Sequence, residues 1–225
     1  YVGDPWIRGA SDQTSHVLEV GYPVGQFYVL KCNGIDEEGH FIYEDLNGDG
    51  TISEADRTYC GDAQPDLTYG WTNTFSYKNW ELSCFIYARW KFTVAKGAET
   101  LGGMYAMRNV DYWVAGSNEN AKYYAPGING IGAADPYSSA MNYQDGSYIK
   151  MRNISLGYNF SPRQLEHWGL GINSLKLYVQ AQNPFTIYRK CKWLDTDLLS
   201  YDNNTTSYGS FTTIRSWVVG IKIGL

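Results

Sequence analysis

Five long stretches in which apolar and polar side chains alternate constrain the fold of this 225-residue chain most. They cover residues 68–77, 80–90, 147–160, 174–184 and 211–225. A period of two places alternate side chains on opposite faces of a β-strand, so each stretch predicts a strand with one apolar face. Globular strands average about five or six residues, whereas a tilted strand that crosses a membrane needs about 9–11. We therefore expect an all-β fold, with antiparallel strands that form part of a transmembrane β-barrel.

The connections between these stretches are of two kinds. Lys78 and Asn79 form a tight turn between the first two stretches, and 161–173 is a modest turn segment with one helical turn. By contrast, 91–145 and 186–210 are long connections, the first of them rich in glycine and aromatic residues. Bacterial barrels have short periplasmic turns and longer extracellular loops, so this asymmetry favours a barrel with its long loops outside.

An antiparallel sandwich with one solvated face is the alternative, because it produces the same alternation. The last stretch argues against it, since its apolar face runs to the end of the chain. That face carries Trp217, Val219, Ile221, Ile223 and Leu225. An open apolar edge at this place would promote aggregation of a soluble protein.

The composition is rich in aromatic residues, at 16%, with 20 Tyr and 8 Trp, and poor in charged residues, at 18%. This suits a β-rich protein whose aromatics lie at a surface, either a membrane interface or a sugar-binding face. Candidates for interfacial girdles are Trp71, Trp80, Trp90 and Trp217. Ordinary cross-strand packing of aromatics in a soluble sheet is the alternative interpretation.

Several classes of function find no support in the sequence. The formal net charge is −5 without a basic stripe, which argues against a nucleic-acid partner. No apolar run approaches the ~18 residues of a membrane helix. The chain shows no Ser/His/Asp set, phosphate loop or paired carboxylates, so we predict no enzyme activity. The chain begins at Tyr1, and we expect it to be part of a longer protein.

The four cysteines are Cys32, Cys60, Cys84 and Cys191. They share no CxxC spacing, which makes a zinc or redox site a poor interpretation. Cys32 and Cys60 lie on either side of an acidic loop and would be able to form a disulfide in an oxidising compartment. Four free thiols are the equally acceptable alternative.

The acidic loop, residues 45–56, has the spacing of a Ca²⁺-binding loop of the EF-hand or dockerin type. The ligands that this spacing predicts are the side chains of Asp45, Asn47, Asp49 and Asp56 and the backbone carbonyl of Thr51. Gly50 follows the first three side chains, where the loop needs a sharp turn that a Cβ would hinder. We therefore name Ca²⁺ as the candidate cofactor.

Two observations limit this interpretation of the acidic loop. Its last ligand position holds Asp56 where an EF-hand has a bidentate Glu, which shortens the reach and weakens the affinity. A flanking helix on each side is not evident, so the loop is Ca²⁺-type without being an EF-hand domain. The alternative is a surface turn without a metal, because NGDG is strong turn chemistry by itself.

Six motifs in a fixed order resemble a known family. They are GYPVGQFY at 21–28, DLNGDGTISEAD at 45–56, GDAQPDLTYGWTNTFSYKNWELS at 61–83, DGSYIKMRNISLGYNF at 145–160, LKLYVQAQNPFTIY at 175–188 and GIKIGL at 220–225. Together they resemble the C-terminal part of SusC/RagA-type TonB-dependent outer-membrane transporters of Bacteroidetes. The resemblance covers essentially the whole chain.

This resemblance implies a bacterial outer-membrane protein that contacts membrane lipid and belongs to a plugged barrel of about 22 strands. It also implies nutrient import with a SusD-like surface lipoprotein and the TonB system, and an oligosaccharide or a peptide as substrate. Residues 1–66 would then be an extracellular loop region with the cation loop, and 67–225 would be C-terminal barrel strands. Two features depart from the family: no plug or TonB-box region is present, and Leu225 stands where an aromatic residue is usual.

Three functions therefore remain in competition. The first is a barrel segment of a nutrient importer. The second is a soluble calcium-containing β-module that binds glycans through exposed aromatics, and the third is a structural segment without activity of its own. The first two make different predictions for Val219, Ile221 and Ile223, because a barrel exposes these side chains to lipid and a soluble module must bury them.

Overall fold

The computed structural model describes residues 6–8, 16–23, 26–95, 111–121, 123–125, 143–169, 171–191, 197 and 213–224. The chain divides into two compact units. The strand unit comprises residues 65–91, 146–198 and 208–225, and the loop unit comprises 1–64, 92–145 and 199–207. The five long stretches and the acidic loop therefore belong to different units.

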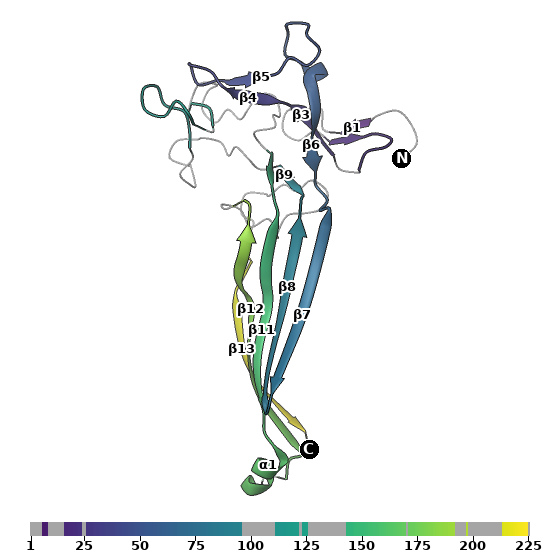
Figure 1. Cartoon of the computed structure of the whole chain (residues 1–225), viewed down its shortest axis with the longest axis vertical. Helices are drawn as coiled ribbons and strands as arrows, with labels where there is room; N and C mark the ends of the chain where they lie inside the picture. Colours follow the sequence, from purple (N-terminus) through teal and green to yellow (C-terminus); the bar gives the residue numbers. More distant parts are fainter. Residues whose placement is uncertain are drawn as a thin grey trace. The chain divides into compact units, whose positions relative to one another are not determined.

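A five-stranded antiparallel sheet forms the strand unit. Its strands are β7 (Leu67–Tyr77), β8 (Trp80–Trp90), β11 (Tyr148–Asn159), β12 (Ser174–Arg189) and β13 (Ser216–Gly224). Their order in the sheet is β13-β12-β11-β8-β7, and Figure 1 shows them as long neighbouring ribbons. All five predicted strands are present, so the predicted antiparallel all-β class is confirmed.

The register of the strands divides the side chains into two faces, because directly paired residues point to the same side. One row of paired residues consists of Tyr77, Trp80, Tyr158, Leu177 and Ile221, and the next row on that face consists of Phe75, Leu82, Leu156, Val179 and Val219. The intervening row on the other face consists of Ser76, Glu81, Gly157, Tyr178 and Gly220. The first face is apolar and the second is largely polar.

Strand β12 continues five residues past the predicted end at 184 and includes Pro184. Proline removes a ladder hydrogen bond and is tolerated inside a sheet at bulges. Here the register of β11 against β12 shifts between Met151 and Asn153, and Asn183 takes a positive φ of 48°. The bulge therefore accommodates the proline, and the loop predicted at 186–210 begins later than expected.

A short helix, α1 (Pro162–Trp168), fills the segment where one helical turn was predicted. Proline at its first turn suits the helix start, and the Ser161 backbone N–H donates to Gln164 Oε1 over 2.8 Å. Gly169, with φ 64°, ends the helix. The described part of the chain holds no helix that is long and apolar enough to span a membrane.

Short strands build the loop unit. They are β1 (Trp6–Arg8), β2 (His16–Leu18), β3 (Gln26–Leu30) and β6 (Arg57–Asp62) in one sheet, the pair β4 (Cys32–Ile35) and β5 (Phe41–Tyr43), and the pair β9 (Thr93–Ala95) and β10 (Tyr143–Asp145). Its core gathers Phe27, Val29, Ala63 and Tyr143. The strands predicted at 26–31 and 40–44 are present as β3 and β5. Most of the long connection 91–145 lies outside the described residues.

Candidate functional site

The apolar face of the five-stranded sheet is the largest candidate surface. Aliphatic and aromatic side chains on this face are strongly exposed: Val219 is 78% exposed, Trp217 73% and Ile221 63%. Burying apolar surface is worth about 25 cal/mol per Å², so such a face needs apolar surroundings. The sequence identified these side chains correctly because apolar and polar positions alternate along β13, with Val218 as the one apolar side chain on the polar face.

Aromatic side chains mark both ends of this face. At the end near the β7–β8 turn, the rings of Trp80 and Tyr158 meet edge to face, with centroids 4.9 Å apart. At the opposite end, Trp90 and Tyr188 lie 5.5 Å apart. Rings with an apolar body and a polar atom suit the boundary between hydrocarbon and water. Of the four predicted girdle tryptophans, Trp80 and Trp90 lie at the ends of β8.

The two remaining predicted girdle tryptophans occupy inner rows of the same face. Trp71 stands opposite Ile86, and Trp217 stands opposite Ala181. Both are exposed. Trp71 therefore lies within its strand, whereas Trp217 is the second residue of β13 and belongs to a row that crosses the middle of the face.

The polar face carries an ion pair that spans three strands. Lys176 Nζ on β12 lies 2.7 Å from Glu81 Oε1 on β8, although β11 runs between these strands. Gly157 of β11 makes this possible, because a Cβ there would come within 2.6 Å of Lys176 Cε. Serine, threonine and glutamine occupy much of the rest of this face.

A buried cluster of charges lies on the polar side of the sheet where β11 begins. Asp197, whose side chain is 4% exposed, accepts a hydrogen bond from Tyr148 Oη at 2.6 Å. It also pairs with Arg152 Nη2 at 2.6 Å and with Lys150 Nζ at 3.2 Å. Lys150 donates in addition to Thr213 Oγ1. One carboxylate thus holds two cations and a phenol together.

Sequence reasoning missed this cluster. Asp197 lies 45 to 49 residues beyond its three partners in the chain, and no local pattern links a lone aspartate to a strand so far away. The alternation predicted for 147–160 places Tyr148 and Lys150 on the same face as Ile154, and only the register shift between Met151 and Asn153 brings them to the polar face.

The acidic loop is organised by hydrogen bonds to its own backbone. Asp45 accepts from the N–H groups of Gly48 at 2.7 Å and Gly50 at 2.8 Å. Asn47 accepts from the N–H of Asp49 at 2.8 Å, and Asp49 accepts from the N–H of Thr51 at 2.7 Å. Asn47 and Asp49 are exposed and Asp45 is half-buried. The three side chains follow one another around the turn, as Asx-type turns do.

Asp56, the last predicted ligand, is fully buried and plays a different part. Its Oδ1 accepts from the N–H of Leu46 at 3.0 Å and of Asn47 at 3.3 Å, and its Oδ2 accepts from the N–H of Ser53 at 2.8 Å. The hydrogen bond from Ser53, followed by those from Asn47 and Leu46, holds the pKa of Asp56 below its ordinary value, against the opposing effect of burial. Asp56 therefore ties the two ends of the loop together.

The three aspartates of the loop do not converge on one point. Among the described residues, which include the whole of 45–56, no three His, Cys, Asp or Glu side chains lie where they would hold one metal ion. Asp45 and Asp49 keep unused lone pairs, since a carboxylate offers about four acceptor sites. Asp56 has both oxygens committed to backbone donors. Ca²⁺ binding by this loop stays a prediction.

All four cysteines are free thiols, so Cys32 and Cys60 are not bridged in this structure. Cys32 donates its S–H to the carbonyl of Gly34, at 3.3 Å. Burial raises the pKa of the Cys60 thiol to about 11. A thiol with that pKa is almost entirely protonated at neutral pH and reacts slowly.

Comparison with known proteins shows which proteins this chain resembles. No protein-family model matches the chain. The chain is 28% identical over 245 residues to TonB-dependent receptor P3 of Formosa agariphila, with 93% of this chain and 23% of the relative covered. It is 30% identical over 208 residues to TonB-dependent receptor SusC of Bacteroides thetaiotaomicron, with 88% of this chain and 19% of the relative covered. The chain thus spans about a fifth of the length of these relatives.

Solved structures give the same fold. The RagAB peptide transporter superposes with a TM-score of 0.71 at 17% identity, over 98% of this chain and 24% of that one. The RagAB peptide importer in its closed-closed state gives a TM-score of 0.68 at 18% identity, over 99% of this chain and 25% of that one. At this identity the likeness shows a shared fold. Together with the TonB-dependent receptors among the sequence relatives, it identifies the sheet as the β-barrel region of an outer-membrane protein. The chain is therefore a β-barrel segment of the SusC/RagA-type TonB-dependent outer-membrane transporters.

Proposed function

We propose that the strand unit forms five neighbouring strands in the wall of a TonB-dependent barrel that imports nutrients across the outer membrane. The observation that carries this proposal is the division of the sheet into an apolar and a polar face over strands of 9 to 16 residues. Transmembrane barrels need this alternation, because lipid-facing and lumen-facing positions follow one another along every strand.

The apolar face would contact lipid, and the polar face would line the barrel interior. On the lipid side, the exposed side chains of Val219 and Ile221 would contact hydrocarbon, which is more favourable than contact with water. On the lumen side, Lys176 would keep its charge satisfied by Glu81. The strand unit itself would then be a rigid wall, and the loops would present the surfaces that meet substrate.

The substrate class that we propose is an oligosaccharide or a peptide, taken up with a SusD-like surface lipoprotein and with energy from the TonB system. SusC among the sequence relatives and the RagAB peptide transporter among the solved structures support this choice. Transport in such an assembly requires no bond-breaking chemistry by the barrel wall. We accordingly propose that the chain is not an enzyme.

A soluble calcium-containing β-module that binds glycans is the second candidate function. Exposed aromatics such as Tyr69, Trp71 and Trp80 favour it, since flat rings stack on sugars. The exposed aliphatic side chains on the same face count against it, because a soluble module has no reason to leave Val219 and Ile223 in water. The barrel accounts for both classes of side chain.

We propose further that the acidic loop binds Ca²⁺ weakly. Side-chain oxygens of the exposed Asn47 and Asp49 and of the half-buried Asp45 would supply three ligands, and the backbone carbonyl of Thr51 would add another. Asp56 would become a Ca²⁺ ligand only if it lost hydrogen bonds from backbone N–H groups. Extracellular Ca²⁺ modules bind in the range of roughly 10⁻⁴–10⁻³ M, and an incomplete ligand set belongs at the weak end of that range.

Uptake by whole cells tests the proposed import function. Cells with and without the full-length gene would be given labelled oligosaccharides and labelled peptides, each with TonB present or deleted. We expect one substrate class to enter only when both the gene and TonB are present. Equal uptake in all four strains would contradict the proposal.

A further inference from the structure

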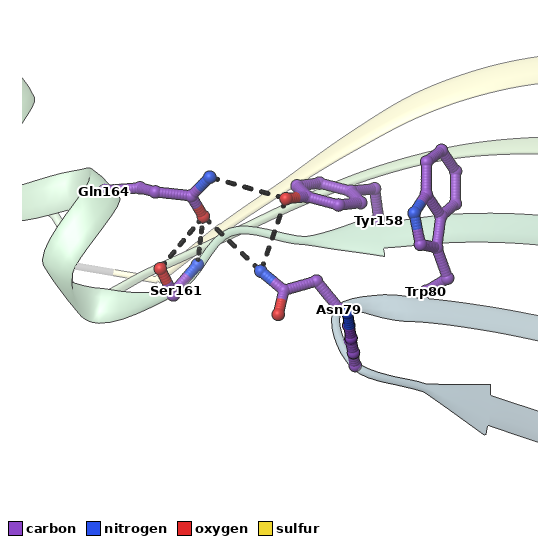
Figure 2. Close-up of a pocket in the computed structure, with 6 residues that line it drawn as sticks. Asn79, Trp80, Tyr158, Ser161 and Gln164 are labelled. Atoms are coloured by element: carbon purple, nitrogen blue, oxygen red, sulfur yellow. Dashed lines mark hydrogen bonds between the residues drawn. The ribbon is translucent and has the colours of Figure 1, made fainter.

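A pocket lies where the β7–β8 turn meets the start of α1, at one end of the five-stranded sheet. Its volume is about 340 Å³. Lys78, Asn79, Trp80, Tyr158, Ser161 and Gln164 line it, and all six belong to the strand unit. Figure 2 shows the side chains of Asn79 and Gln164 directed toward Tyr158, with Trp80 beside its ring.

One wall of this pocket continues the apolar face of the barrel wall. Trp80 and Tyr158 are directly paired in register and share a row with the exposed Tyr77. The next row of that face begins with Leu82 and Leu156. An alkyl chain lying along the strands would therefore run from these aliphatic side chains straight to the pocket.

The other wall supplies hydrogen-bond donors and a positive charge. Asn79 Nδ2 makes only long hydrogen bonds, 3.4 Å to Tyr158 Oη and 3.4 Å to Gln164 Oε1. The Lys78 ammonium lies 5.3 Å from the centre of the Tyr77 ring. None of the described residues that line the pocket is an aspartate or a glutamate. The site thus favours a ligand with an anionic head.

The backbone at Lys78 is an independent sign that this side chain has a role. Lys78 takes a positive φ of 53°, a conformation that L residues adopt at a cost of order 1 kcal/mol and that glycine adopts freely. Two-residue hairpin turns favour Gly, Asn or Asp at such positions. A lysine there keeps a charge at the turn where the turn geometry alone would select another residue.

We propose that this pocket binds the phosphate head of a diacyl glycerophospholipid from the surrounding membrane. The phosphodiester would lie against Lys78 Nζ and Asn79 Nδ2, and the indole N–H of Trp80 would lie close by. One acyl chain would follow the apolar rows past Leu82 and Leu156. A phospholipid of the membrane already lies against the lipid-facing side of the pocket, and its acyl chain can contact the apolar rows. A soluble anion or a sugar has no acyl chain and cannot make these contacts.

Native mass spectrometry of the full-length transporter in detergent tests this site. The protein would be titrated with dioleoylphosphatidylglycerol, with dioleoylglycerol, which lacks the phosphate, and with the phospholipid in the presence of inorganic phosphate. We expect one tightly bound phospholipid, at least tenfold weaker binding of dioleoylglycerol, and no displacement by inorganic phosphate. Losing one charge-assisted hydrogen bond in Lys78→Gln should weaken phospholipid binding roughly tenfold.

Matched variants make the result specific. Lys190→Gln removes the same charge from an exposed position at the opposite end of the sheet and should bind as wild type does. Lys78→Arg should restore binding. Lys78→Gly removes the charge and also removes the backbone strain of the positive φ. If this variant binds phospholipid weakly while its heat-modifiable electrophoretic mobility is unchanged, misfolding is excluded as the cause. Equal effects of Lys78→Gln and Lys190→Gln, tight binding of dioleoylglycerol, or full displacement by phosphate would each overturn the proposal.

Discussion

Lys176 on β12 passes over Gly157 of β11 to reach Glu81 on β8, with 2.7 Å between Nζ and Oε1. The pair joins strands that are not neighbours in the sheet. The ion pair depends on Gly157, because only a residue without a side chain leaves room for the lysine to cross β11 on the polar face. The relationship links backbone, packing and charge on the side of the sheet that we assign to the barrel interior.

Gly157→Ala should therefore act by displacing Lys176. The new methyl group would clash with the flexible end of the lysine and would make only an ordinary contact, at 3.6 Å, with the Leu177 carbonyl oxygen. We therefore expect a cost within about 1 kcal/mol, as for partly exposed ion pairs. Urea unfolding of the full-length protein in liposomes measures it. Glu81→Gln should cost a similar amount, and the double variant should be no worse than either single one. Fully additive costs would show that Gly157 does not act through the ion pair.

Asp197→Asn should be far more damaging than a surface charge change. The variant keeps the shape of the side chain but leaves Lys150 and Arg152 without their carboxylate in a buried place. Removing one partner of a buried pair typically costs about 3–5 kcal/mol. Glu54→Gln is the control, because Glu54 is exposed and should change stability by less than about 1 kcal/mol. Similar urea midpoints for the two variants would contradict the role of Asp197.

Asp49 and Asp56 should respond differently to Ca²⁺. Asp49→Ala removes an exposed candidate ligand and should abolish any calorimetric Ca²⁺ signal while leaving the metal-free protein intact. Asp56→Ala removes a buried acceptor of backbone N–H groups, so it should loosen the loop with or without Ca²⁺. Amide hydrogen exchange at Leu46 and Ser53 reports this loosening. Absence of heat and of a thermal shift at millimolar Ca²⁺ in the wild type would leave the loop a turn only.

The same loop should also depend on acidity. The pKa of Asp56 is lower when folded than its ordinary value of 3.8, so its contribution to stability is complete above that value. The contribution is lost as the pH falls through the folded pKa, below 3.8. Exchange at Ser53 should therefore accelerate beyond its intrinsic trend in that acidic window, and Asp56→Asn should remove this dependence. Loss of protection between pH 5 and 7 would contradict this assignment.

The orientation of the barrel can be tested by labelling intact cells. We expect the β7–β8 turn at Lys78 and Asn79 to be periplasmic and the long connections to face outside, following the loop lengths of bacterial barrels. Asn79→Cys and Asn118→Cys in the full-length protein would be treated with a membrane-impermeant maleimide. Label should reach position 118 and spare 79 until the cells are opened. Labelling at 79 alone would reverse the orientation.

The strands were predictable because alternation is local information. The first two predicted ranges, 68–77 and 80–90, match β7 and β8 within one residue, since a tight turn at Lys78 and Asn79 limits both strands. Strand β12 was predicted too short because Pro184 reads as a stop in sequence. The bulge that admits the proline depends on the neighbouring strand β11, which local pattern does not describe.

Two other features could not be read locally, for different physical reasons. Strand β6 lacks a clear alternation and gains its identity by pairing with β3, some 30 residues earlier in the chain. The Asp197 cluster exists only once a distant segment is placed against β11. The acidic loop shows the converse: its spacing predicted a ligand set, but Asp56 serves as a buried acceptor for backbone N–H groups. The spacing of residues in the sequence predicts which oxygens lie near each other, but it does not predict which donor each oxygen accepts a hydrogen bond from.

The most direct test of the barrel-wall assignment is the environment of successive side chains along β13. Single nitroxide labels at positions 217 to 223 of the full-length protein in liposomes would be probed with oxygen, which dissolves in lipid, and with a water-soluble nickel chelate. We predict a period of two, with strong oxygen contact at Trp217, Val219, Ile221 and Ile223 and weak contact at Val218, Gly220 and Lys222. Strong nickel contact at positions 219 and 221, or no alternation, would contradict the claim that this face meets lipid.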